Sequence, residues 1–186
     1  MSSTRRSTVG ALMAVAAMAV GAAPAAHAAS AAKLTAEGRR TLTELEATVP
    51  RSRVFARNAK AIMVFPGIIK GAFVVGAQTG DGVLLEHGRA AGFYNISAAS
   101  FGFQAGGQKF SYVLFFMNEK ALDYIHKSDG WAIGTGPTVV VINKGESAEA
   151  DSETVSQDVY AFPFAEKGLM AGIDIKGSKI TRIHPD

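Results

Sequence analysis

The chain has 186 residues, no cysteine and a formal net charge of +3. A chain of this length can bury one substantial core, so we expect a single domain stabilised by hydrophobic packing rather than by disulfide bonds. The lack of cysteine also argues against a lipoprotein anchor, because that lipid is attached to a cysteine at the cleavage point.

The first 28 residues have the pattern of an export signal. Two arginines near the start are followed by a short apolar stretch at residues 11–23 and by an A-x-A cleavage motif that ends at Ala28. The apolar stretch is weaker than the roughly 20 strongly apolar residues of a membrane-spanning helix. We therefore expect a signal peptide at residues 1–28, a mature domain at 29–186, and a periplasmic or secreted protein. The general secretory route fits this leader better than the twin-arginine route.

Charge is unevenly distributed along the mature chain. Loss of the leader would leave 17 basic and 16 acidic residues, yet residues 33–70 contain eight basic residues and only three acidic ones. Residues 146–158 contain five acidic residues and no basic one. A basic stretch of this kind can face an anionic surface, although solvated charges on a helix and a loop would give the same pattern.

Two helices are expected at the start of the mature chain. Apolar residues recur at helical spacing from Leu34 to Val49, and charged residues occupy the opposite face. We expect a helical extension over residues 29–46. After Pro50, a second and shorter helix is expected to point Phe55 towards the core.

From residue 61 onward the hydrophobic pattern becomes that of strands. We expect a strand at 61–65 that ends at Pro66, a hairpin that turns at residues 79–81, and a helix at 119–127 capped by Asn118. Further strands are expected at 91–96, 100–105, 109–117, 131–133, 138–143, 155–164, 169–175 and 179–183. Short strands with few helices predict an α+β fold, mainly an antiparallel β-sheet curled into a sandwich or barrel, with N-terminal helices and one mid-chain helix.

No arrangement of side chains in the sequence predicts catalysis or a metal site. The glycine-rich stretches lack the Gly-Lys-Ser/Thr of a phosphate-binding loop, and Ser97 and Ser100 lie outside a G-x-S-x-G elbow. His87, His126 and His184 are widely spaced and have no cysteine with which to share a metal. We therefore expect a binding protein rather than an enzyme, without a cofactor. Nucleic acid is not an expected partner, because the aromatic residues are not interleaved with lysine or arginine.

Aromatic residues are concentrated between residues 93 and 116. On the strand expected at 109–117 apolar side chains fall on both faces, which is typical of a central strand covered on both sides. The same pattern would suit a strand that lines an acyl cavity. We favour the core interpretation, since a domain of this size must first fill its interior.

Several motifs occur in the order and spacing of a known family. They are Ala59 to Pro66, Gly71 to Gly82, Phe101 to Gln108, Met117-Asn118-Glu119, Gly136-Pro137 and Lys167 to Gly172. Together they resemble the SYLF domain, a family shared by bacterial exported proteins, yeast actin regulators and lipid-binding proteins of plants and animals. The resemblance extends from about Ala47 to Ile183. The chain departs from the family pattern at residues 93–98, where a tryptophan and a proline are common, and at Ser111, where an aspartate is common.

The resemblance implies phospholipid binding. Eukaryotic members of the family bind phosphoinositides, and this binding is attributed to a basic, amphipathic N-terminal segment. It also implies actin association, as in yeast, although an exported protein would meet actin only in a host. We therefore expect an exported phospholipid-binding module that contacts a membrane surface. The expected lipid-binding residues are Arg39, Arg40, Arg51, Arg53, Arg57 and Lys60. The alternative is a structural or protein-interaction protein of the cell envelope without a specific lipid ligand.

Overall fold

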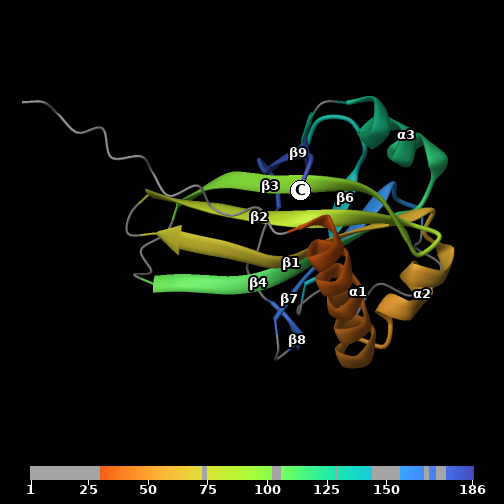
Figure 1. The fold of residues 1–186 in the computed structure, drawn as a ribbon, viewed down its shortest axis with the longest axis horizontal. Helices are drawn as coiled ribbons and strands as arrows, with labels where there is room; N and C mark the ends of the chain where they lie inside the picture. Colours follow the sequence, from red (N-terminus) through yellow and green to blue (C-terminus); the bar gives the residue numbers. More distant parts are fainter. Residues whose placement is uncertain are drawn as a thin grey trace, which may run out of the picture.

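The computed structural model of the protein describes residues 30–72, 75–101, 106–128, 130–143, 156–165, 168–170 and 175–186. The helices in this part of the chain are α1 (Ala31–Thr48), α2 (Ser52–Asn58) and α3 (Glu119–Lys127) (Figure 1). The strands are β1 (Ala61–Ala72), β2 (Val75–Glu86), β3 (Arg89–Phe101), β4 (Gly106–Phe116), β5 (Gly130–Ala132), β6 (Val139–Val141), β7 (Val159–Ala165), β8 (Gly168–Leu169) and β9 (Lys179–Ile183).

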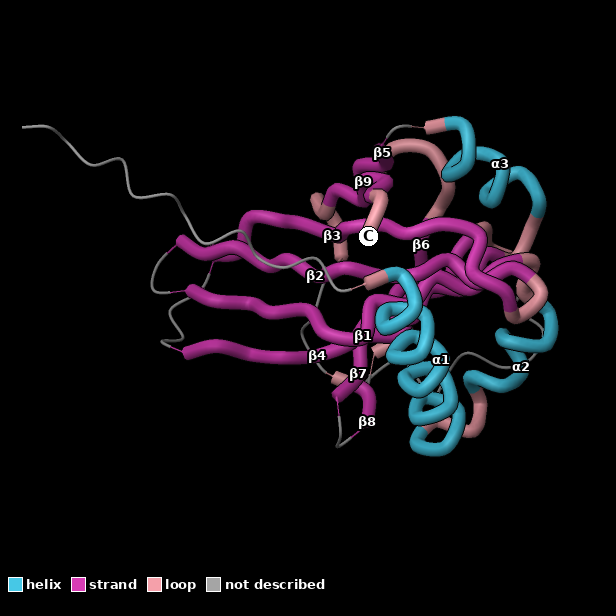
Figure 2. Tube along the Cα trace, viewed as in Figure 1, coloured by secondary structure: helices cyan, strands magenta, loops and turns pink. Residues whose placement is uncertain are grey.

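The described strands form one curled, mostly antiparallel sheet (Figure 2). The strand order is β5-β9-β3-β2-β1-β4-β7-β6, with β8 paired to β7. Within the described strands, the parallel pair is β6 with β7. Helices α1 and α2 lie together on one side of the molecule and α3 lies apart from them, while the long strands β1 to β4 extend past the helices (Figure 1). The prediction of an α+β fold with a curled antiparallel sheet, N-terminal helices and one mid-chain helix is confirmed.

Both faces of the sheet are covered by apolar side chains, and β4 shows this most clearly. Its Tyr112, Leu114 and Phe116 belong to the cluster that includes the buried face of α3. Its Val113 and Phe115 belong to the cluster that includes the buried residues of α1 and α2. Successive side chains of a strand point to opposite faces, so this alternation buries the strand on both sides. The core interpretation is therefore confirmed for the aromatic residues of β4.

Helix α1 packs closely against the sheet because its inward face contains a glycine. The Oγ of Ser30 accepts a hydrogen bond from the Lys33 N–H and caps the helix. Leu34 and Leu45 are buried, and Gly38 lies between them on the same face. A Cβ at Gly38 would lie 2.4 Å from Cγ1 of Val83 on β2. The missing side chain thus sets how near the helix comes to the sheet.

The prediction that the first strand ends at Pro66 is wrong. β1 continues to Ala72, with a bulge between Phe65 and Ile68 in its pairing with β4. The carbonyl of Pro66 accepts a hydrogen bond of 3.0 Å from Oγ of Ser111 on β4. A proline lacks the N–H that a regular ladder needs, and a bulge is where a strand accommodates it.

The prediction of a turn at residues 79–81 is also wrong, since these residues lie inside β2. A Cβ at Gly80 would lie 2.9 Å from the Gly67 carbonyl oxygen, and one at Gly82 would lie 2.4 Å from Cδ1 of Phe65. The glycines therefore serve close packing against β1 and not chain reversal. The turn between β2 and β3 is formed by His87 and Gly88, whose φ angles are 49° and 75°.

Several other expected boundaries shift. The expected strands at 91–96 and 100–105 are parts of the single strand β3 as far as Phe101, and residues 102–105 lie outside the described residues. The expected strand at 169–175 is described only as β8, and residues 171–174 lie outside the described residues. The mid-chain helix α3 and the strand β9 have the predicted bounds.

Candidate functional site

The two arginines of α1 that sequence reasoning selected point in different directions. Nη2 of Arg39 donates a hydrogen bond of 2.8 Å to the carbonyl of Gly88, in the turn between β2 and β3. Arg40 is exposed and lies about 100° further around the helix, since a helix has 3.6 residues per turn. Arg39 therefore connects α1 to the turn between β2 and β3 through a hydrogen bond, whereas Arg40 faces solvent.

Helix α2 presents two arginines on its outer face. Phe55 is 4 % exposed and packs its ring against Tyr160 and Phe162, with centroid distances of 4.8 and 5.2 Å. Arg53 and Arg57 are four residues apart and opposite to Phe55, so they share the exposed side of the helix. Burial of Phe55 thus orients this arginine pair towards solvent. Arg51, immediately before α2, is half-buried.

Lys60 is the last of the predicted lipid-binding residues from Arg39 to Lys60, which we call the basic segment, and it lies beside α3. Its backbone N–H donates to the Phe116 carbonyl at 2.8 Å, which places it beside the end of β4. Its Nζ lies 3.6 Å from Oε1 of Glu119, the first residue of α3. Both side chains are well exposed, so this ion pair is weak, but it shows that the basic segment and the start of α3 are neighbours.

A groove lies beside the first turns of α3, with a volume of about 270 Å³. We call it the α3 groove. It is lined by Lys120, Ala121, Tyr124, Gly136, Pro137 and Asp158. Its residues come from α3, from the loop before β6 and from the segment before β7, so the groove exists only in the folded chain.

Tyr124 forms a fixed wall of the α3 groove. It is 37 % exposed, one of two large exposed apolar side chains among the described residues, the other being Ile69. Its ring packs edge-on against the buried Trp131, with centroids 6.4 Å apart. Gly136 has a φ of +88°, and a Cβ there would lie 2.6 Å from Cζ of Tyr124. The ring is therefore held between an indole and a closely approaching backbone.

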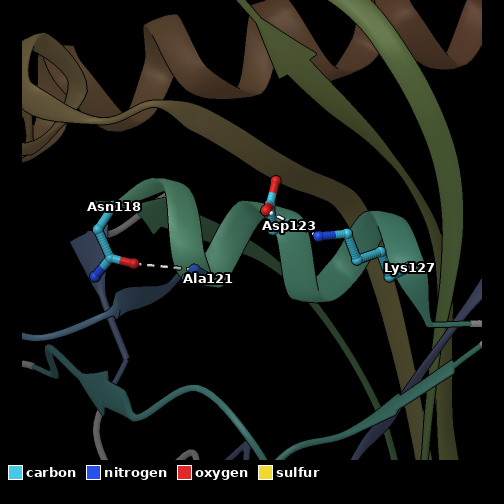
Figure 3. Close-up of polar contacts among 4 residues, drawn as sticks. All are labelled: Asn118, Ala121, Asp123 and Lys127. Atoms are coloured by element: carbon cyan, nitrogen blue, oxygen red, sulfur yellow. Dashed lines mark hydrogen bonds and ion pairs between the residues drawn. The ribbon is translucent and has the colours of Figure 1, made fainter.

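Asp158 forms the polar end of the groove. Its Oδ1 accepts from Nδ2 of Asn118 at 2.8 Å, and its Oδ2 accepts from the Thr138 N–H at 2.9 Å. Asn118 also caps α3, because its Oδ1 accepts from the Ala121 N–H at 2.9 Å (Figure 3). The hydrogen bonds from Thr138 and Asn118 hold the pKa of Asp158 below its usual range.

Sequence reasoning did not select the residues of the α3 groove as a site, although Gly136-Pro137 was among the motifs that carried the family resemblance. Lys120 and Tyr124 have the i, i+4 spacing that places them together on an exposed helix face, and this was the available signal. No local pattern places Pro137 and Asp158 beside this helix, because they reach it through tertiary contacts.

Within the part of the chain that the structure describes, no group of three metal-binding side chains comes together. His126 instead forms a contact of 2.7 Å with Glu86, which joins α3 to the end of β2. Among the same residues, no helix has the length and apolarity needed to span a bilayer.

The fold and these surfaces define a small α+β domain that presents, among its described residues, an arginine pair on a short helix and a groove beside another helix. The family model described as Ysc84, Las17-binding protein actin regulator, matches residues 97–184. The predicted resemblance to the Ysc84 (SYLF) domain family is therefore confirmed over this segment of the chain. The match runs from within β3 to the end of β9. No curated protein matches the chain.

Proposed function

We propose that the protein is an exported phospholipid-binding module and not an enzyme. In this proposal the signal peptide is removed after Ala28, and the mature protein works in the periplasm or outside the cell at a membrane surface. The Ysc84 (SYLF) family is associated with lipid binding, which supports the choice of ligand. The family description also names Las17 binding and actin regulation, but the predicted export makes lipid the more accessible partner.

The observation that carries the proposal is the outward arginine pair of α2. Arg53 and Arg57 are exposed on one helix face, while the opposite face is buried through Phe55. Two guanidinium groups on one solvent-facing side can contact phosphates of a flat anionic surface together. Arg40, Arg51 and Lys60 flank this helix in sequence, and Arg39 already donates to Gly88. We therefore place the main headgroup contact at Arg53 and Arg57, with secondary contributions from the other cations.

Vesicle sedimentation with the chain that begins at Ala29 tests the proposal. Wild-type protein is expected to bind phosphatidylglycerol vesicles and not phosphatidylcholine vesicles, with binding that weakens as salt rises. The Arg53→Glu, Arg57→Glu variant should bind about thirtyfold more weakly, since each cation near an anionic bilayer contributes about 1 kcal/mol. The exposed pair Arg89 and Lys179, on β3 and β9, supplies a matched control of equal charge change.

The control variant Arg89→Glu, Lys179→Glu should retain most of the wild-type affinity. Equal losses in the two variants would show that net charge alone controls binding and would remove the assignment to α2. A folded wild-type protein that does not sediment with either kind of vesicle would favour the alternative, a structural or protein-interaction protein of the cell envelope.

A further inference from the structure

We infer that the α3 groove binds one phospholipid molecule, with its phosphate at Lys120 and the adjoining apolar part against Tyr124 and Pro137. The inference rests on the proposed function and deepens it, because it adds a site for a single lipid to a surface that contacts many headgroups. Three features carry it: the lining of the groove, the distribution of charge within it, and its position next to the basic segment.

The lining combines an apolar wall with few polar groups, as small-molecule sites do. Tyr124, Pro137 and Ala121 supply the apolar contacts. The Tyr124 ring is held by Trp131 and by the backbone of Gly136, so the wall is formed before any ligand arrives. A preformed wall reduces the ordering cost of binding. A volume of about 270 Å³ suits the glycerol end of a lipid rather than two whole acyl chains.

The charge distribution favours an anionic ligand. Asp158 is the acid in the groove, and both of its carboxylate oxygens already accept hydrogen bonds, from Asn118 and from Thr138. Lys120 is exposed and attracts the Asp158 carboxylate electrostatically, but no ion pair to Lys120 is seen among the described residues. The ammonium of Lys120 is therefore the group at the rim that can bind a phosphate oxygen.

The position of the groove fits a protein that lies on a bilayer through α2. Lys60, at the end of the basic segment, is ion-paired with Glu119, and Glu119 directly precedes Lys120. Helices α2 and α3 also lie at the same end of the sheet (Figure 1). A headgroup held near α2 is thus close to the mouth of the groove, where one lipid can tilt its glycerol end against Tyr124.

Monomeric short-chain lipid tests the inference without any bilayer. The probes are dihexanoyl phosphatidic acid, dihexanoyl phosphatidylcholine and inorganic phosphate, titrated by calorimetry and by ¹H–¹⁵N NMR. Trp131 is the single tryptophan of the chain, and its Nε1–H donates to the Thr135 carbonyl at 2.8 Å, next to Gly136 of the groove wall. Its indole N–H signal therefore reports on the groove without a full assignment.

We expect phosphatidic acid to bind saturably and to shift the indole signal. Lys120→Gln should weaken this binding about fivefold, as for the loss of one cation near an anionic group. Tyr124→Ala should weaken it roughly tenfold through lost apolar contact. Lys127→Gln is the matched control, because Lys127 lies on the same helix, is paired with Asp123 at 3.0 Å (Figure 3) and does not line the groove.

Several outcomes would overturn the inference, and one would reject only the proposed function. Absence of saturable binding, binding that leaves the indole signal in place, or equal affinity in the Lys120→Gln and Lys127→Gln variants would show that the groove is not the site. Inorganic phosphate that binds as tightly as phosphatidic acid would assign Lys120 to free phosphate and not to lipid. If monomeric lipid fails while vesicles still require Arg53 and Arg57, the groove is rejected and the proposed function stands. If monomeric lipid binds but vesicles do not, the bilayer function is rejected.

Discussion

Asp158 joins three segments of the chain through its backbone and its carboxylate. Its carbonyl accepts from the Met117 N–H at 2.9 Å, and its carboxylate accepts from Asn118 and from the Thr138 N–H. It therefore links the end of β4, the cap of α3 and the start of β6. Hydrogen bonds that favour the ionised form lower the pKa of this carboxyl in the folded state.

The lowered pKa of Asp158 predicts a specific acid sensitivity. The ionised Asp158 carboxylate contributes to the free energy of unfolding above the pKa of an unfolded aspartate, about 3.9. This contribution is lost as the pH falls from there through the lower pKa of the folded state. Asp158→Asn should be less stable than wild type at pH 7, and this difference should shrink below about pH 4. Thermal melts from pH 7 to pH 3 measure it. Asp123→Asn, which removes an exposed carboxylate paired with Lys127, is the control and should follow the wild-type dependence of stability on pH. A stability difference between Asp158→Asn and wild type that stays constant from pH 7 to pH 3 would contradict the prediction.

At the scale of elements, the contact between α1 and the sheet depends on Gly38. The neighbouring inward residues Leu34 and Leu45 are buried, and Gly38 brings the helix backbone close to Val83 and Val64. A side chain at this position would overlap Cγ1 of Val83, so the helix would have to move away from the strands that it covers.

Gly38→Val is therefore expected to lower the free energy of unfolding by about 1–3 kcal/mol, as overpacking of a core does. The helix propensity of valine is higher than that of glycine, so propensity alone would act in the opposite direction. Ala36→Val, on the exposed side of the same helix, is the control and should change stability by less than about 1 kcal/mol. Urea unfolding of both variants distinguishes the two effects. A Gly38→Val protein as stable as wild type would show that α1 does not press against the sheet.

At the scale of the whole molecule, the start and the end of the described chain meet. The Ala31 N–H donates to the Asp186 carbonyl at 3.1 Å, and Ser30 caps α1 directly before it. The sheet also combines the two halves of the sequence, because β1 pairs with β4, and β3 with β9. The segment matched by the Ysc84 model thus shares its sheet with strands that precede the match.

Signal cleavage after Ala28 would leave this arrangement intact, since Ser30 and its cap remain. We expect protein from the periplasmic fraction to begin at Ala29 in N-terminal sequencing. Its mass should be lower than that of the full chain by the mass of residues 1–28. A chain that retains Met1 and fractionates with the membrane would contradict the prediction and would show that residues 1–28 act as a membrane anchor. A cytoplasmic protein used as a fractionation marker controls for lysis.

Local patterns in the sequence were sufficient for the helices and the fold class. The apolar spacing around Leu34 and Leu45, the burial of Phe55 and the Asn118 cap depend on residues within a few positions of one another, and each was predicted. Alternation of apolar residues likewise predicted that the strand around Leu114 is covered on both sides. The basic segment was predicted as well, and its role in lipid binding stays a prediction.

Only the tertiary structure decided the roles of Pro66, Gly80 and the α3 groove. Pro66 and Gly80 have the residue types of turns, yet the bulge and the close approach of β1 to β2 place them inside long strands. The groove joins Tyr124 to Pro137 and Asp158, which are distant in sequence. Such features depend on which strands become neighbours, and that follows from the burial of both faces of the sheet rather than from any local preference.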